Sequence, residues 1–245
     1  MADPIHQFQI QNIGPQLSVA GIDVSFTNSA LWMVIAALVS TSVLTLAMRR
    51  PQMVPGRLQV FAESMYQFVA KMVDENVGLK GREYFPFIFT LFTVVLMGNM
   101  LGLIPYSFTY TSHLAVTAGL AVFIFIWVTV LGFVKHGAHF LHFFSPEGVP
   151  FALKFLVIPL EIISYMTRPL TLAMRLFANM MAGHLVLKVF AGFCVSLMSL
   201  SIVASVIPMA FNVIMIMFEV LIAFLQAYVF TVLTCIYFKD ALEMH

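Results

Sequence analysis

The sequence predicts an all-α polytopic membrane protein, with about five membrane helices and one amphipathic helix at the membrane surface. Of its 245 residues, 61% are hydrophobic and only 9% are charged, whereas an ordinary soluble domain carries about 25% charged residues. So few polar side chains cannot cover a soluble globule of this size. We expect residues 1–245 to form a single membrane domain.

Charge and motifs argue against two classes of ligand. The formal net charge is +1, so the chain has no global basic field that would attract nucleic acid. The sequence contains neither the phosphate-cradling pattern GxxxxGKS/T nor GxGxxG. We therefore expect no nucleic-acid partner, no nucleotide site and no cofactor.

Three apolar segments have the length of ordinary membrane helices, which is about 20 residues. They cover residues 29–48, 84–104 and 114–134. Residues 1–27 lack the basic start and early apolar run of a signal peptide. We expect residues 1–27 to form an outside segment, followed by a retained first helix.

Two later apolar segments are much longer, and together they form the region 149–238. Segments 149–190 and 197–238 would each extend on the order of 60 Å as helices, about twice the hydrocarbon thickness. Each must therefore be broken or strongly tilted, and internal prolines permit kinks. We expect two long, tilted helices that form a hairpin and join near Gly192.

The region 55–80 has a different pattern, in which apolar residues recur at helical spacing between charged ones. This pattern predicts an amphipathic helix at the membrane surface, with a solvated connector as the alternative. The apolar positions are Leu58, Phe61, Met65, Phe68 and Met72.

The distribution of Lys and Arg predicts the orientation. Cytoplasmic loops carry an excess of these residues, and they are absent from the loop 105–113. Alternate sides are basic and non-basic, so we expect the N-terminus outside and the C-terminus in the cytoplasm. The basic positions are Arg49, Arg50, Arg57, Lys135, Lys154 and Lys239.

The fourth apolar segment carries charges that are expensive inside a membrane and are usually functional. Arg175 lies well inside the segment 149–190, and a central Arg costs about 2.5–3.5 kcal/mol on insertion scales. Glu161, Arg168 and Arg175 are seven residues apart and share a helix face, on which Asn179 also lies. Ser164 lies close to this face, whereas His184 is rotated about half a turn from Arg175 and should face another neighbour.

The last apolar segment has a polar stripe with the same spacing. Asn212, Glu219 and Gln226 follow Ser205 at intervals of seven residues. Such a stripe can simply hold helices together by hydrogen bonds, although a carboxylate is a poor choice for packing alone. Glu and His can titrate, whereas Arg cannot be deprotonated in proteins. These residues indicate a proton pathway beside a fixed cation, and they do not by themselves identify the protein.

Four stretches resemble the ATP synthase a subunit family, and the resemblance covers nearly the whole chain from the first span onward. RPLTLAMRLFANMMAGH at 168–184 resembles the family's arginine signature, and FEVLIAFLQAYV at 218–229 resembles its last helix. GNMLGLIP at 98–105, which contains Asn99, and the loop 135–150 are also similar to the family.

The resemblance implies a role for several residues. Arg175 matches the essential arginine that faces the rotor ring, and Glu161 matches an acidic position of the inner half-channel. Four residues match positions around the outer half-channel: Asn179, His184, Glu219 and Gln226. Supporting polar roles are expected for Asn212, Ser164, Arg168 and Asn99.

The same resemblance implies a proton-channel subunit with no catalytic nucleotide site. Its partners would be the c-ring subunits, against which the long hairpin would lie, peripheral-stalk b-type subunits, the lipid bilayer and, indirectly, the soluble ATPase head. Its location would be the bacterial plasma membrane, with the mitochondrial inner membrane as the alternative. A standalone ion channel or secondary transporter and a purely structural membrane anchor remain the rival functions.

Two smaller features receive structural interpretations. Cys194 and Cys235 lie in apolar stretches and should be near opposite ends of the hairpin, which argues against a disulfide. His136, His139 and His142 are spaced by three, but a loop at the membrane interface explains them better than a metal site does.

Overall fold

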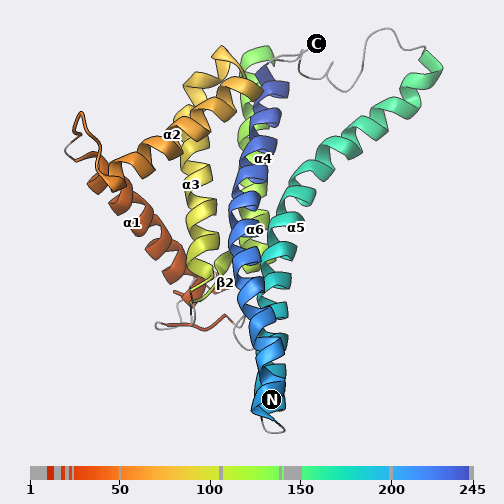
Figure 1. Cartoon of the computed structure of the whole chain (residues 1–245). Coiled ribbons are helices and arrows are strands. Elements are labelled where there is room, and N and C mark those ends of the chain that lie inside the picture. Colours follow the sequence, from red (N-terminus) through yellow and green to blue (C-terminus); the bar gives the residue numbers. More distant parts are fainter. Residues whose placement is uncertain are drawn as a thin grey trace.

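The computed structural model (Figure 1) describes residues 10–13, 18–19, 22–23, 25–49, 51–104, 107–137, 140, 151–198 and 201–242. Its architecture is all-α, as the sequence predicts. Within these ranges, the strands are β1 (Ser18–Val19) and β2 (Ile22–Asp23), which pair antiparallel ahead of the first helix. The helices are α1 (Asn28–Met48), α2 (Arg57–Asn76), η2 (Leu79–Tyr84), α3 (Phe85–Gly102), η3 (Tyr110–Ser112), α4 (Leu114–His136), α5 (Phe151–Met198) and α6 (Ile202–Leu242).

Five helical segments are long and apolar enough to cross a membrane, which confirms the prediction of a multi-pass protein. Two of them, within α5 and α6, contain 46 and 38 residues, well beyond the length that a membrane requires. The five segments are Asn28–Met48, Lys80–Gly102, Leu114–His136, Leu153–Met198 and Ser205–Leu242.

Helix α2 is amphipathic and lies across the top of the bundle in Figure 1. Its apolar face buries Met65, Val69, Met72 and Val73, whereas most of its charged side chains are exposed. The C-terminal ends of α4 and α6 lie at this same end of the molecule, and the C-terminal ends of α3 and α5 lie at the other. The position of α2 at a membrane surface stays a prediction.

Helix α3 lies at the centre of the bundle and packs against α1, α2 and α6. Phe92 and Val95 are buried in the same core as Val69 of α2, Ile124 of α4 and Phe230 of α6. In a membrane such a core gains little from exclusion of water, so close packing and interhelical hydrogen bonds must hold the helices together.

Helices α5 and α6 form the expected hairpin, but their junction differs from the prediction. We expected the junction near Gly192, whereas α5 continues to Met198 and α6 begins at Ile202. A glycine within a helix costs only about 1 kcal/mol relative to Ala. The helix therefore continues through Gly192, and the Phe190 ring packs on Phe211 of α6 with centroids 4.2 Å apart.

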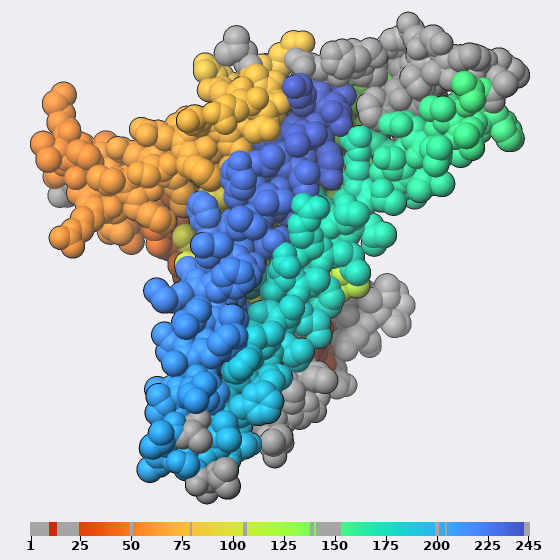
Figure 2. Space-filling model, turned by 45° about the vertical axis from the view of Figure 1, so that its right-hand side comes forward, coloured from red at the N-terminus to blue at the C-terminus, as the bar shows by residue number. Residues whose placement is uncertain are grey.

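The two long helices run side by side over much of their length (Figure 2) and diverge near the N-terminal end of α5 (Figure 1). In this diverging part, large apolar side chains such as Phe155 and Met166 are exposed. Pro159 and Pro169 lie inside α5, and Pro208 lies inside α6. The 48 residues of α5 would extend about 72 Å at 1.5 Å per residue.

Candidate functional site

A buried carboxyl group lies between the two long helices. Glu219 of α6 is only 3% exposed, and neither of its carboxyl oxygens has a hydrogen-bond partner among the described residues. Gly183 of α5 provides the space, because a Cβ atom at this position would lie 2.7 Å from Glu219 Oε1. A buried carboxyl group without hydrogen bonds is costly, which indicates a functional rather than a packing role.

His184 is the closest ionisable neighbour of Glu219. Its Nδ1 lies 3.4 Å from Glu219 Oε1, and both side chains are buried. The other ring nitrogen, Nε2, lies 2.9 Å from Thr109 Oγ1 in the segment between α3 and α4. The structure therefore joins three elements in one polar cluster, Thr109–His184–Glu219, as the rotation of His184 away from Arg175 had suggested.

The polar stripe of α6 continues above and below Glu219. Ser205 and Gln226 are buried and Asn212 is half-buried, so the heptad spacing does place them on the inward side of the helix. Asn99 of α3, with no exposed surface, donates from Nδ2 to the carbonyl oxygen of Ala223 at 3.2 Å. Asn99 thus fastens α3 to α6 within one turn of Glu219.

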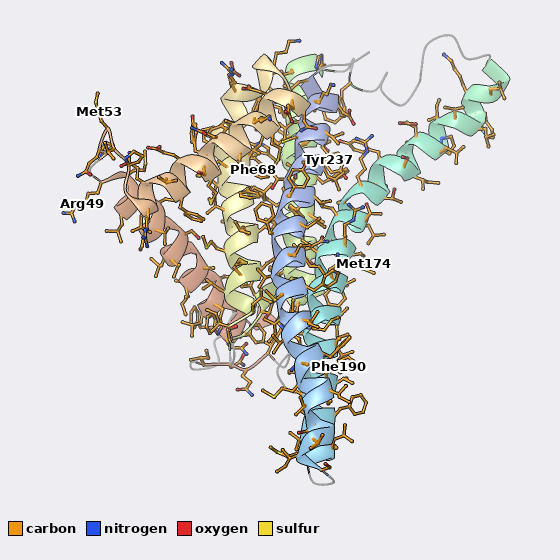
Figure 3. The ribbon with its side chains drawn as sticks, viewed as in Figure 1. Arg49, Met53, Phe68, Met174, Phe190 and Tyr237 are labelled. Atoms are coloured by element: carbon orange, nitrogen blue, oxygen red, sulfur yellow. The ribbon has the colours of Figure 1, made fainter. Side chains whose placement is uncertain are left out.

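Arg175 has a different environment, since its side chain is exposed whereas Leu172 and Leu176 of the same helix are buried. Among the described residues, no acidic side chain forms an ion pair with it. Asn179, one turn later, is half-buried. Arg175 is therefore directed out of the chain, and the neighbouring Met174, labelled in Figure 3, is exposed as well.

The exposed surface of the two long helices is mostly apolar. Exposed large hydrophobic residues cover much of α5 and α6, the helices that lie side by side in Figure 2. On α6 they include Met217, Phe218, Leu221 and Phe224. Such a surface requires lipid or another apolar surface to cover it.

Arg168, in contrast, is fully engaged within the chain. Its Nη1 lies 2.7 Å from Asp240 Oδ2 near the end of α6, and its Cζ lies 5.4 Å from the ring centroids of Tyr165 and Tyr237. Figure 3 labels Tyr237 on the upper part of α6. This cluster ties the two long helices together close to the point where they diverge.

Glu161 and Ser164 lie apart from the buried cluster, on the first part of α5. Glu161 is half-buried and Ser164 is exposed. The structure therefore does not bring these residues together with His184 and Glu219, although Glu161 shares a helix with His184.

The hydrogen-bonding partners of Arg168 and His184 in these clusters, Asp240 and Thr109, were missed by the sequence reasoning. Asp240 lies fourteen residues after Gln226 and so continues the heptad stripe, a signal that was present in the sequence. Thr109 carried no such signal, because a hydroxyl in a connecting segment is common and its contact with His184 joins residues 75 positions apart.

The structure also shows the environments of both cysteines and of one of the three spaced histidines. Cys194 and Cys235 are both free thiols. Among the described residues, no group of three His, Cys, Asp or Glu side chains could hold a metal ion. His136 is half-buried at the end of α4, whereas His139 and His142 lie outside the described residues.

The chain is similar to known proteins along nearly its whole length. Residues 30–239 match the family described as ATP synthase A chain. A protein named ATP synthase subunit a from Paramagnetospirillum magneticum is 51% identical over 248 residues, with all of both chains covered. Proteins of the same name from Pelagibacter ubique and Rhodospirillum rubrum are 49% and 51% identical, and the matches cover at least 98% of either chain.

Proposed function

Because this chain belongs to the ATP synthase A chain family and functions in the membrane sector of the proton-translocating F-type ATP synthase, we propose that it carries protons through two offset half-channels to and from a rotating c ring. The observation that carries the proposal is the separation of two features. A titratable pair, His184 and Glu219, is buried inside the chain, and a fixed cation, Arg175, is directed out of it.

The buried pair belongs to the outer half-channel in this proposal, together with Asn179 and Gln226. A proton enters from outside, passes Glu219 and His184, and neutralises a carboxylate of the ring. A carboxyl group and an imidazole suit this relay, because both exchange protons. The burial of both side chains supports the assignment.

Arg175 is the barrier between the half-channels. It cannot release its proton, so it cannot itself carry the flow. Its charge favours the ionised form of an approaching ring carboxylate, which therefore gives up its proton to the inner side. The exposure of Arg175 on an apolar face supports contact with a partner, because an arginine facing lipid alone would cost several kcal/mol.

The inner half-channel includes Glu161, with Ser164 close by. Glu161 lies in the first part of α5, 22 residues before Gly183, the α5 residue that lies against Glu219. In this proposal Arg175 separates two proton paths that open at different points along the same hairpin. Each charge that crosses a potential of 100 mV supplies about 2.3 kcal/mol to drive rotation.

The partners and the location follow from the same family. We propose that the α5–α6 face contacts the c ring, that b-type peripheral-stalk subunits hold the chain in place, and that the soluble ATPase head acts indirectly. The relatives compared above are bacterial, which favours the bacterial plasma membrane. The proposed orientation has the N-terminus outside, the C-terminus in the cytoplasm and α2 at the cytoplasmic surface.

Replacement of Arg175 by Ala in the complete ATP synthase complex, reconstituted in liposomes, tests this function. ATP-driven proton pumping should disappear while passive proton leak increases, because the barrier between the half-channels is lost. Arg57→Ala, which removes an exposed arginine of α2, is the matched control and should pump normally. Normal coupled pumping by Arg175→Ala would contradict the proposal.

The rival functions give different results in a second experiment. A standalone channel or transporter would move protons in liposomes as the isolated chain. A structural anchor would tolerate replacement of Glu219 by Gln without a change in proton flux, whereas the proposal expects slower turnover.

A further inference from the structure

We propose that His113 takes up protons at the mouth of the outer half-channel and passes them to water that Ser29 and Thr111 hold inside the chain. This inference rests on the proposed function, because it adds an entry step to the outer path through His184 and Glu219. His113 ends the segment 107–113, the last part of the connection from α3 to α4. In the proposed orientation this segment lies on the outer side.

The segment 107–113 is rich in buried hydroxyl groups, in a chain that is mostly apolar. Four of its side chains are at most 3% exposed: Ser107, Thr109, Thr111 and Ser112. Thr109 Oγ1 lies 2.9 Å from His184 Nε2, so the segment reaches the buried cluster that contains Glu219. His113 is four residues further along and is half-buried, so this residue keeps some exposed surface. The segment thus leads from the exterior to the buried cluster.

Three buried polar atoms at this end have no hydrogen-bond partner among the described residues. They are Ser29 Oγ, Thr111 Oγ1 and His113 Nε2, and Ser29 and Thr111 are only 5% and 3% exposed. The atoms come from the start of α1, from η3 and from the N-cap of α4, and η3 packs against both helices. Buried polar groups are paired with protein or with ordered water. The three atoms therefore indicate a position where water enters between these elements.

Further unpartnered atoms continue this route towards the centre of the chain. They are Asn99 Oδ1 in the last turn of α3, Asn212 Oδ1 of α6 and both carboxyl oxygens of Glu219. Within the described ranges, His136 Nε2 at the other end of α4 is the one such atom that lies off the route. The distribution favours a hydrated path that begins at His113, because each buried polar atom left unpaired would cost about 1–3 kcal/mol.

The His113 ring is held at the boundary between the exterior and this path. It stacks on Phe108, with centroids 4.9 Å apart and an interplanar angle of 18°, and Phe108 belongs to a small core with Ala36 of α1. Nε2 is enclosed, whereas the residue as a whole keeps exposed surface. An imidazole accepts a proton at one nitrogen and releases one from the other, so a ring in this position can transfer protons inwards.

The surroundings favour release of the proton over its retention. Burial lowers the pKa of the His113 imidazole below its usual value, so the neutral ring is the resting form at pH 7. Helices α1 and α3 carry no charged side chain in their described ranges. The titratable groups of the other elements around this end are Tyr110 of η3, His184 and Lys188 of α5, Glu219 of α6, and Lys135 and His136 at the far end of α4.

The transfer itself requires only water. An O–H bond of a hydronium ion or a buffer acid on the outer side breaks, an N–H bond forms on the ring, and an imidazolium results. The N–H bond at Nε2 then breaks as the proton passes to water beside Ser29 and Thr111. Rotation about the Cβ–Cγ bond returns the neutral ring to its starting tautomer.

Such a residue matters most when protons are scarce. Free protons at pH 7 are at about 0.1 μM, so direct capture at a diffusion limit of about 10⁹–10¹⁰ M⁻¹s⁻¹ supplies about 10²–10³ protons per second, and tenfold fewer at pH 8. A histidine can also take protons from buffer acids, which are far more concentrated. The contribution of His113 should therefore increase with pH.

ATP synthesis by the complete complex in liposomes tests this entry step. With the ATPase head outward, the lumen corresponds to the outer side, and a fixed K⁺–valinomycin potential drives synthesis at equal pH on both sides. His113→Gln keeps a polar side chain that cannot take up a proton. Its rate should match that of the unaltered complex near pH 6 and should fall about tenfold for each pH unit once direct capture is limiting. The unaltered complex should lose much less.

Imidazole enclosed in the lumen separates proton transfer from support of the fold. His113→Ala leaves space that imidazole can occupy, so imidazole should restore much of the lost rate, whereas pyrazole, which has the same shape but is not protonated near pH 7, should not. Thr111→Val should slow synthesis several-fold at every pH, with no recovery in imidazole. The matched control is His136→Ala, whose Nε2 is also buried without a partner but lies at the other end of α4, and it should keep the normal pH profile. ATP hydrolysis checks assembly of each variant, and the pH profile of His113→Gln alone decides if His113→Ala does not assemble.

A normal rate and pH profile in His113→Gln would overturn the inference. A loss of equal size at every pH that imidazole does not restore would also overturn it, because His113 would then only support the fold. Normal synthesis in Thr111→Val would overturn the transfer to water at that hydroxyl. Failure of the proposed function has a different signature, since His184→Gln and Glu219→Gln would then leave proton flux unchanged.

Discussion

Arg168 and Arg175 lie seven residues apart on α5, but their surroundings are opposite. Arg168 is paired with Asp240 at 2.7 Å and lies against two tyrosine rings. Arg175 is exposed and forms no ion pair with the described part of the chain. The first arginine holds two helices together, whereas the second is available to a group outside the described part of the chain, which in our proposal is a ring carboxylate.

The helix geometry does not explain this difference. Seven residues fall only about 20° short of two full turns, so the two side chains share nearly the same face. The difference comes from α6, which presents Asp240 at the level of Arg168 and no acidic partner at the level of Arg175. Identical residue types on one face of a helix can therefore have unrelated roles, which the neighbouring helix decides.

The largest expected effect comes from exchanging each arginine for lysine. Arg175→Lys should reduce ATP-driven pumping to background, because an ammonium group can lose its proton in an apolar contact and lacks the planar fork of arginine. Arg168→Lys should retain most of its pumping, because lysine can still pair with Asp240. Proton pumping by reconstituted complexes measures both, and equal losses would show that the two arginines do not differ in role.

A smaller loss is expected when the space for Glu219 is reduced. Gly183→Ala places a methyl group 2.7 Å from Glu219 Oε1 and must displace the carboxyl group. A displacement of about 1 Å can cost a catalytic step up to about 100-fold, so we expect pumping to fall by about 10- to 100-fold. Gly192→Ala on the same helix is the matched control, since its Cβ would meet no atom within 4 Å. If both alanine variants pump equally well, the position of Glu219 is not critical.

Loss of the Arg168–Asp240 pair should lower stability rather than stop pumping. Arg168→Gln and Asp240→Asn, made singly and together, form a double-mutant cycle for this half-buried contact. We expect a coupling energy of about 1.5–3 kcal/mol from thermal or denaturant unfolding, the range for hydrogen bonds to charged groups. A coupling energy near zero would mean that the tyrosine rings alone hold Arg168.

The smallest effect is expected for the exposed pair Asp74–Arg82, in which Arg82 Nε lies 3.0 Å from Asp74 Oδ1. The hydrogen bond from Arg82 holds the pKa of the Asp74 carboxyl below its usual value. The ion pair therefore contributes to the free energy of unfolding at pH values above the pKa that Asp74 has in the unfolded chain. That contribution is lost as the pH falls through the lowered pKa of Asp74 in the folded chain. Asp74→Asn should leave stability at pH 7 almost unchanged, because exposed ion pairs contribute little. A melting curve that shifts as much as for Asp240→Asn would contradict this ranking.

The sequence alone was sufficient to predict that the protein is a membrane protein, where its helices lie and which of several residues belong to the candidate site. A long apolar run predicts a membrane helix because the bilayer requires every backbone polar group to be paired within it. Arg175, His184 and Glu219 were recognisable because an ionisable residue in such a run is expensive wherever its neighbours are. The heptad stripe of α6 was also visible in the sequence, and the structure shows that Glu219 and Gln226 on this stripe are buried.

Only the tertiary structure decided which of these residues meet. It brings Thr109 to His184 and His184 to Glu219, pairs Arg168 with Asp240, leaves Arg175 exposed and separates Glu161 from the buried cluster. The physical reason is the range of each interaction. The cost of burying a charge in an apolar helix can be recognised from the sequence of that one segment. A contact between residues 75 positions apart depends instead on how three separate elements pack.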